Sequence, residues 1–243
     1  MSEQRSFAAF DIDGTIFRSS LYIEVVYELE RRKIIDVDQE VHDAALERWN
    51  RREEHGYLDY RDAMVEILES QIIGIDVEEF EAAADSVIEQ QANHTYVYTE
   101  RQLQAARDAG KFLIAISGSQ EQLVERFAKH YGFDAWVGQH YGVENGKFNG
   151  EITKTHKGKD EILSGLLDRH NLITSESWAV GDTEGDIGML SMVDRAIAFN
   201  PNRKLYLHAV KHGWEVVVER KDMVYKLHPA SDGRTIYELI DTE

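Results

Sequence analysis

The chain has 243 residues, of which 42% are hydrophobic and 30% are charged, which fits a soluble globular protein of one or two domains and excludes a fibrous or disordered one. Lys plus Arg total 27 against 45 Asp plus Glu, so the formal net charge is −18, and such a surface repels nucleic acid and anionic membranes. Cysteine is absent, no apolar run has the roughly 18 residues of a membrane span, and the polar start has no apolar signal segment behind it. We therefore expect a cytoplasmic protein that binds neither nucleic acid nor membrane.

The first predicted element is a buried strand over residues 6–10, because this short apolar run stops abruptly at polar residues. It stops at the acidic, glycine-bearing stretch Asp11-Ile-Asp-Gly-Thr15. Ligands of open α/β sheets usually bind at the carboxyl ends of strands. The stretch after this strand is therefore the first candidate for a functional site.

Residues 21–91 have the apolar spacing of amphipathic helices, with no comparable strand among them. This segment follows directly after the first acidic stretch. A helical insert in that position is a candidate lid over the site.

After Tyr98 the predicted elements alternate in type. The order is a helix over 100–109, a strand over 112–116, a helix over 120–130, a strand over 135–137, a hairpin that turns at Asn145-Gly146, a helix over 159–170, a strand over 178–180, an acidic loop over 181–186, an apolar run over 196–199, a helix over 203–211 and an apolar run over 215–218. Such alternation is typical of a parallel sheet covered by helices. We therefore predict an α/β fold with a Rossmann-like parallel-sheet core, formed by residues 1–17 and 97–243, and an inserted α-helical cap over residues 18–96.

Polar residues follow several of these strands or open the next helix. They are Asp11 and Asp13, Ser117 and Gly118, a lysine at 157 or 159, and Asp182 and Asp186. Carboxylates gathered at one edge need a cation, and a ligand set made only of oxygens favours Mg²⁺. A hydroxyl, backbone amides and a lysine ammonium beside that cation would hold a phosphoryl group.

The two aspartates of the first stretch suit complementary roles in phosphate ester hydrolysis. Asp11 could attack phosphorus and form an aspartyl phosphate, because a carboxylate is a competent nucleophile once the phosphoryl charge is neutralised. Asp13 could then give a proton to the leaving oxygen and later take one from water.

These motifs together resemble the haloacid dehalogenase superfamily of phosphohydrolases, over residues 7–190. The resemblance rests on Asp11-Ile-Asp-Gly-Thr15, on Ser117 in Ile116-Ser-Gly-Ser119, on a lysine, and on the acidic loop from Gly181 to Asp186, in the family's order. The helical insert and the hairpin segment Asn145-Gly-Lys-Phe-Asn-Gly-Glu-Ile152 further resemble the phosphoserine-phosphatase-like branch.

The resemblance implies a role for each matching residue. Asp11 would be the nucleophile and Asp13 the acid and base, with Mg²⁺ held by Asp11, the Asp13 carbonyl and Asp182. Asp186 would assist the metal from a more distant position, and Ser117 and Gly118 would bind phosphate. For the lysine we favour Lys159 over Lys157, because Lys159 opens the helix before the acidic loop.

Two positions depart from the branch's pattern. Phosphoserine-specific members carry a Glu soon after the first motif, and Ser20 stands at the matching position here, with Arg18 nearby. Gly185 replaces the Asn that often precedes the second aspartate of the acidic loop. The first departure argues against phosphoserine as the substrate, and the second removes one polar side chain from the site.

The sequence thus predicts a Mg²⁺-dependent phosphatase that hydrolyses a small phosphomonoester through an aspartyl phosphate. Phosphoserine phosphatase proper and a phosphotransferase that uses the same intermediate are the enzymatic alternatives. A phosphorylated receiver domain uses similar residues, but it is about half this length and places its aspartate on a middle strand. A catalytically silent binding protein is the remaining alternative.

Overall fold

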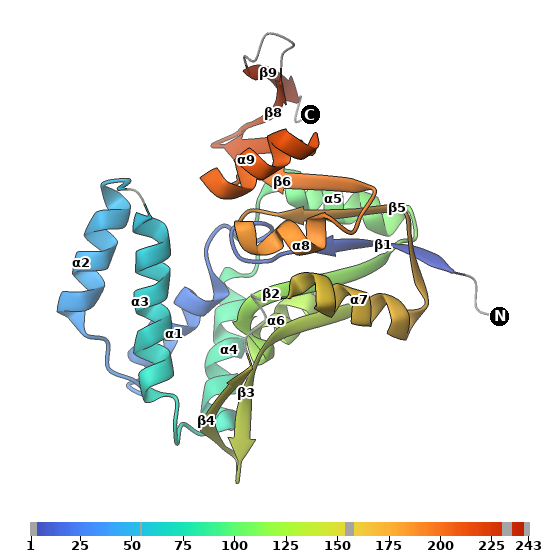
Figure 1. Cartoon of the computed structure of the whole chain (residues 1–243). Coiled ribbons are helices and arrows are strands. Elements are labelled where there is room, and N and C mark those ends of the chain that lie inside the picture. The colour runs from blue at the N-terminus through green and yellow to red at the C-terminus, as the bar shows by residue number, and fades with distance from the viewer. Residues whose placement is uncertain (1–3, 54, 154–157, 230–234, 241–243) are drawn as a thin grey trace.

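The computed structural model describes residues 4–53, 55–153, 158–229 and 235–240, and its strands form one sheet (Figure 1). The strand order is β4-β3-β2-β1-β5-β6-β7-β8-β9. Neighbouring strands from β3 to β7 are parallel, whereas β4, β8 and β9 pair antiparallel at the two edges. The strands are β1 (Arg5–Phe10), β2 (Phe112–Gln120), β3 (Ala135–Glu144), β4 (Lys147–Thr153), β5 (Leu172–Gly181), β6 (Arg195–Phe199), β7 (Glu215–Arg220), β8 (Met223–Pro229) and β9 (Thr235–Ile240).

Helices connect the strands and cover the parallel part of the sheet. They are α1 (Leu21–Arg31), α2 (Gln39–Asn50), α3 (Gly56–Gln71), α4 (Val77–Gln91), α5 (Val97–Asp108), α6 (Glu121–His130), α7 (Lys159–His170), α8 (Ile187–Leu190) and α9 (Arg203–His212), with a 3-10 turn over Glu184–Asp186. The predicted α/β class is therefore confirmed.

The central strand β1 is buried on both faces, because helices cover each side of the sheet. Phe7 and Ala9 pack in the hydrophobic cluster formed with α7, α8 and α9, whereas Ala8 and Phe10 belong to the cluster on the opposite face, with α5 and α6. All four side chains are fully buried. A strand buried on both sides has a continuous apolar sequence, which explains why β1 ends so sharply at Asp11.

Helices α1 to α4 are inserted between β1 and α5, as the sequence predicts. The two chain segments that enter and leave the insert run side by side, since Arg18 N donates to His94 O (2.8 Å) and Tyr96 N donates to Ile16 O (2.9 Å). Helix α4 packs against α6, whereas α2 and α3 form a pair that stands away from the sheet (Figure 1). The insert is thus anchored on the core by α4, while α2 and α3 project from it.

The structure confirms one local prediction and differs from others. The hairpin at Asn145-Gly146 is confirmed, and the two turn residues have positive φ angles of 52° and 78°. Strand β5 begins at Leu172, six residues before the expected start, because its polar first half pairs with Arg5 and Ser6 before a register shift. The antiparallel strands β8 and β9 were not predicted.

No helix within the described residues is long and apolar enough to cross a membrane.

Candidate active site

The first acidic stretch forms a tight turn directly after β1. Asp11 N still donates to Val180 O (3.0 Å) and continues the sheet, and Thr15 N then donates to Ile12 O (3.1 Å) and closes the turn. Gly14 has a φ of +77°, and a Cβ atom there would lie 2.3 Å from Asp182 Oδ2. A glycine at this position therefore lets the acidic loop approach the turn.

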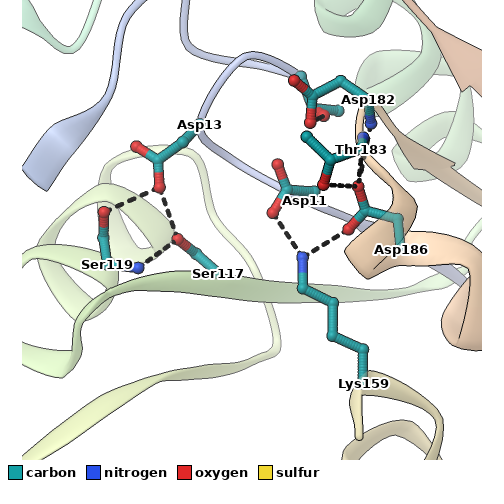
Figure 2. Close-up of polar contacts among 9 residues, drawn as sticks. Asp11, Asp13, Ser117, Ser119, Lys159, Asp182, Thr183 and Asp186 are labelled. Atoms are coloured by element: carbon teal, nitrogen blue, oxygen red, sulfur yellow. Dashed lines mark hydrogen bonds and ion pairs between the residues drawn. The ribbon is translucent and has the colours of Figure 1, made fainter. Parts of the chain in front are cut away.

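Lys159 lies between two aspartates in the buried part of the site (Figure 2). Its Nζ donates to Asp11 Oδ1 and to Asp186 Oδ1, both at 2.6 Å. Burial by itself lowers the pKa of Lys159, but the two carboxylates outweigh it and raise the pKa above its usual value. The ammonium group thus stays charged. Lys157, the alternative lysine, lies outside the described residues.

Asp186 fixes the acidic loop that follows β5. Its Oδ2 accepts hydrogen bonds from the backbone N of Asp182 (3.1 Å) and of Thr183 (2.9 Å), while its Oδ1 accepts from Lys159. A Cβ atom on Gly181 would lie 2.5 Å from the Asp186 Cβ atom, so only glycine fits there. Asp186 therefore links the loop backbone to the lysine.

Asp11, Asp182 and Asp186 form a group that could hold a cation. Each offers one carboxylate oxygen, and these atoms lie within 4.8 Å of one another. Burial raises the pKa of Asp11 although Lys159 opposes it, and burial together with the charges of Asp11 and Asp186 raises the pKa of Asp182 well above its usual value. One lysine does not offset three crowded carboxylates, so the donor set fits a divalent cation that prefers oxygen ligands.

Asp13 points away from this group, toward the C-terminal end of β2 (Figure 2). Its Oδ2 accepts hydrogen bonds from the hydroxyls of Ser117 and Ser119, both at 2.8 Å. Its Oδ1 accepts from the backbone N of Leu21 (2.5 Å), the first residue of α1. Asp13 thus connects the turn after β1 to β2 and to the insert.

Two cavities open beside this arrangement and share part of their lining. The first, which we call the Asp13 cavity, has a volume of about 710 Å³ and is lined by Asp11, Asp13, Ser20, Tyr22, Gly118, Ser119, Gln139, Lys159, residues 182–185 and the α3 residues Tyr57, Leu58, Arg61, Asp62, Val65, Glu66, Glu69 and Ser70. The second, the Arg18 cavity, has a volume of about 1140 Å³ and reaches the site through Gly14 and residues 182–184. Tyr57 lines both cavities, and its pKa is raised by burial and by the charges of Asp13 and Asp182.

The structure brings together most of the residues that the sequence singles out. Gly118, Ser20 and Gly185 line the Asp13 cavity, and Ser117 reaches Asp13. Arg18 lines the other cavity and pairs with Glu219 on β7, so it does not accompany Ser20 into the Asp13 cavity.

Three neighbours of the site were missed. Ser119 donates a hydrogen bond to Asp13, Tyr57 lies close enough to Asp13 and Asp182 for their charges to raise its pKa, and the Thr15 hydroxyl lies 3.4 Å from Asp182 Oδ1. Ser119 could have been suspected from its place two residues after Ser117, but nothing near Tyr57 in the sequence indicates its position.

The chain belongs to the haloacid dehalogenase-like hydrolases, because the model of that family matches residues 8–191. The predicted resemblance is therefore confirmed. A putative hydrolase of Mycobacterium leprae is 27% identical over 149 residues, which are 60% of this chain and 50% of that protein. The phosphoserine phosphatase SerB1 of Mycobacterium tuberculosis is 30% identical over 113 residues, which are 45% of this chain and 36% of that protein. The alignments thus span half or less of these relatives' length.

Solved structures with low sequence identity share the fold. A protein of unknown function from Bordetella pertussis superposes with a TM-score of 0.70 at 20% identity, and the match covers 88% of this chain and 98% of the other. A phosphoserine phosphatase with an analogue of its phospho-aspartyl intermediate superposes with a TM-score of 0.59 at 19% identity, over 90% of this chain and 96% of the other. At these identities the comparison establishes the fold alone.

Proposed function

We propose that the protein is a Mg²⁺-dependent phosphatase that hydrolyses small phosphomonoesters through a phosphorylated Asp11. The observation that carries the proposal is the arrangement of the aspartates. Asp11 lies with Lys159 and two further carboxylates, whereas Asp13 lies separately at the cavity wall with hydroxyl partners. These different surroundings suit the two proposed roles, that of nucleophile for Asp11 and that of general acid and base for Asp13.

Asp11, Asp182 and Asp186 are the side chains that would hold the metal, and the Asp13 carbonyl is a further candidate ligand. Bound Mg²⁺ would neutralise the charge of the phosphoryl oxygens so that an anionic carboxylate can approach phosphorus. Lys159 adds one positive charge on the side of Asp11 and Asp186. Gly118 and Ser117, near the C-terminal end of β2, would hold the remaining phosphoryl oxygens.

The reaction would proceed in two displacements at phosphorus. In the first, an Asp11 carboxylate oxygen forms a bond to phosphorus while the bond to the ester oxygen breaks, and protonated Asp13 gives its proton to that oxygen. In the second, Asp13 takes a proton from water, the water oxygen attacks phosphorus, and the bond to Asp11 breaks. Inorganic phosphate leaves, and both aspartates return to their starting states.

We further propose that residues 18–96 act as a cap on a core made of residues 1–17 and 97–243. Helix α3 supplies much of the wall of the Asp13 cavity, and its Tyr57 lies close to the catalytic carboxylates. The hydrogen bond from Leu21 N to Asp13 connects the proposed acid and base to the first helix of the cap.

The test is phosphate release from p-nitrophenyl phosphate with Mg²⁺ and with EDTA. Wild-type protein should hydrolyse the ester only with the metal, and Asp11→Asn should abolish turnover, because an amide is a poor nucleophile. Asp108→Asn, an exposed change of the same kind on α5, is the matched control. Mass spectrometry of acid-quenched wild-type protein should find phosphate on Asp11. A folded wild type without metal-dependent activity, or an active Asp11→Asn variant, would refute the proposal.

A further inference from the structure

The two carboxylate oxygens of Asp13 have different hydrogen-bond partners. Oδ1 accepts from the backbone N of Leu21, and a backbone N–H group can only donate. Oδ2 accepts from the hydroxyls of Ser117 and Ser119, and a hydroxyl can rotate so that it either donates or accepts (Figure 2). Oδ2 is therefore the oxygen that can carry a proton while its partners adjust to it.

The two serines differ in their other contacts. Ser117 Oγ also accepts from Ser119 N at 2.9 Å, so this hydroxyl is tied to the backbone of β2. In the described part of the chain, Asp13 and Ser119 line the Asp13 cavity, whereas Ser117 does not, and neither Asp13 nor Ser119 lines the Arg18 cavity. Ser119 is thus the hydroxyl partner of Asp13 on the side that is open to a ligand.

A distortion of β2 sets the place of Ser119. Strand β2 advances four residues between its pairings with Val137 and Gln139 of β3, although these two are only two positions apart. The extra residues lie within positions 117–119. Such bulges bend a strand and redirect its side chains, and they are frequent next to active sites.

The core holds Ser119 closely in this place. A Cβ atom on Gly138 of β3 would lie only 3.0 Å from Ser119 O and 2.6 Å from Glu121 Cα, so the glycine lets the end of β2 approach β3. Ser119 is only 1% exposed, which leaves its hydroxyl little freedom to turn toward solvent. The contact with Asp13 therefore comes from the core, whereas Leu21 N belongs to the first helix of the proposed cap.

We propose that Ser119 is a positioning residue for the reaction, because its hydroxyl keeps Oδ2 of Asp13 oriented for proton transfer to the leaving alcohol. The inference rests on the proposed phosphatase function, in which Asp13 is the general acid and base. As the bond from phosphorus to the ester oxygen breaks, its electron pair stays on that oxygen, which takes the proton from Oδ2. The Ser119 hydroxyl then donates to the oxygen that has become anionic.

The test is the dependence of kcat/KM on the leaving alcohol, measured with p-nitrophenyl, phenyl and benzyl phosphate. The alcohol that is released becomes more basic along this series, so its departure depends increasingly on a proton from Asp13. In Ser119→Ala we expect kcat/KM to fall by about ten-fold for benzyl phosphate and by about two-fold or less for p-nitrophenyl phosphate. The larger loss is a part of the roughly 100- to 10,000-fold that general acid catalysis contributes.

Two further variants separate positioning from a general loss of structure. Ser119→Cys keeps a similar side-chain volume and replaces the hydroxyl with a weak donor, so it should show the same steeper dependence on the leaving alcohol. Ser177→Ala removes an equally buried hydroxyl, which donates to Thr174 O in the first half of β5, and should leave the ratio of the benzyl and p-nitrophenyl values unchanged. The ratio compares two esters in one preparation, so a smaller folded fraction does not alter it.

A loss in Ser119→Ala that is equal for the three esters, no loss at all, or a wild-type ratio in Ser119→Cys would overturn the inference while the wild type still hydrolyses p-nitrophenyl phosphate with Mg²⁺. Failure of folded wild-type protein to hydrolyse any of the three esters would instead overturn the phosphatase function itself, and the inference with it.

Discussion

Replacing Lys159 by Met removes the one positive charge between Asp11 and Asp186 and keeps a side chain of similar length. In the wild type the ammonium group makes two contacts of 2.6 Å, and its side chain is only 5% exposed. Methionine cannot donate to either carboxylate. Asp11 and Asp186, both buried, would then face each other and Asp182 with no cation between them.

The structure gives the size of the effect. Removing one partner of a buried ion pair costs about 3 to 5 kcal/mol, because the remaining charge stays buried without compensation. Here the lysine has two partners, and Asp186 keeps its backbone amide donors from Asp182 and Thr183. We therefore expect the free energy of unfolding at pH 7, without metal, to fall by about 3 kcal/mol.

The assay is urea unfolding in EDTA, with Lys129→Met as the control. Lys129 is 61% exposed and forms an ion pair of 2.7 Å with Glu125, so its replacement should cost about 0.5 kcal/mol or less. In Lys159→Met, the additional change Asp11→Asn should restore about 1 kcal/mol or more, since it removes one of the uncompensated charges. A loss below about 1 kcal/mol for Lys159→Met, or additive effects in the double variant, would refute this account of the site.

Three further changes test other parts of the structure. Gly14→Ala places a Cβ atom 2.3 Å from Asp182 Oδ2 at a φ of +77°, so we expect a higher Mg²⁺ requirement in the phosphatase assay and a free energy of unfolding lower by about 1 kcal/mol. Glu219→Gln weakens the acceptor that binds Tyr98 N at 2.8 Å, and urea unfolding should give a loss of about 2 kcal/mol. Glu28→Gln should destabilise most at neutral pH, because hydrogen bonds from Arg31 and Arg32 lower the pKa of Glu28 to about 2; its contribution is present above the unfolded value near 4.5 and is lost as the pH falls toward 2.

For each of these three predictions there is an experimental result that would contradict it. An unaltered Mg²⁺ titration in Gly14→Ala would mean that Asp182 can move without consequence. Wild-type stability in Glu219→Gln would show that the contacts of β7 with the insert connections contribute little. A stability difference for Glu28→Gln that grows toward low pH would have the wrong sign for an acid whose pKa is lowered by folding.

Much of the architecture follows from local sequence patterns. The apolar run before Asp11 predicts β1, helical spacing predicts the insert, and Asn145-Gly146 predicts its hairpin, since each signal depends on neighbouring residues only. Strands β8 and β9 escaped prediction because they pair antiparallel at the edge of the sheet, without the continuous apolar sequence of the central strands.

The residues of the candidate site also divide into those that the sequence patterns identify and those that only the packing of the chain reveals. Asp11, Asp13, Lys159, Asp182 and Asp186 could be named from the sequence, because strand ends of a parallel sheet meet at one edge whatever the details of packing. The polar residues at that edge were enough to predict a phosphoryl site and a metal site. The family match supports the same class of protein, a haloacid dehalogenase-like hydrolase.

The tertiary structure alone decided which residues line the cavity beside Asp13. Asp13 and Ser119 are 106 residues apart in the chain, and Glu69 approaches Tyr141 across 72 residues. No periodicity or motif encodes such pairs, because they depend on how the insert packs against the core. The sequence by itself therefore predicted a phosphoryl site at the sheet edge, and the packing of α3 over that edge determined what else lines the cavity beside it.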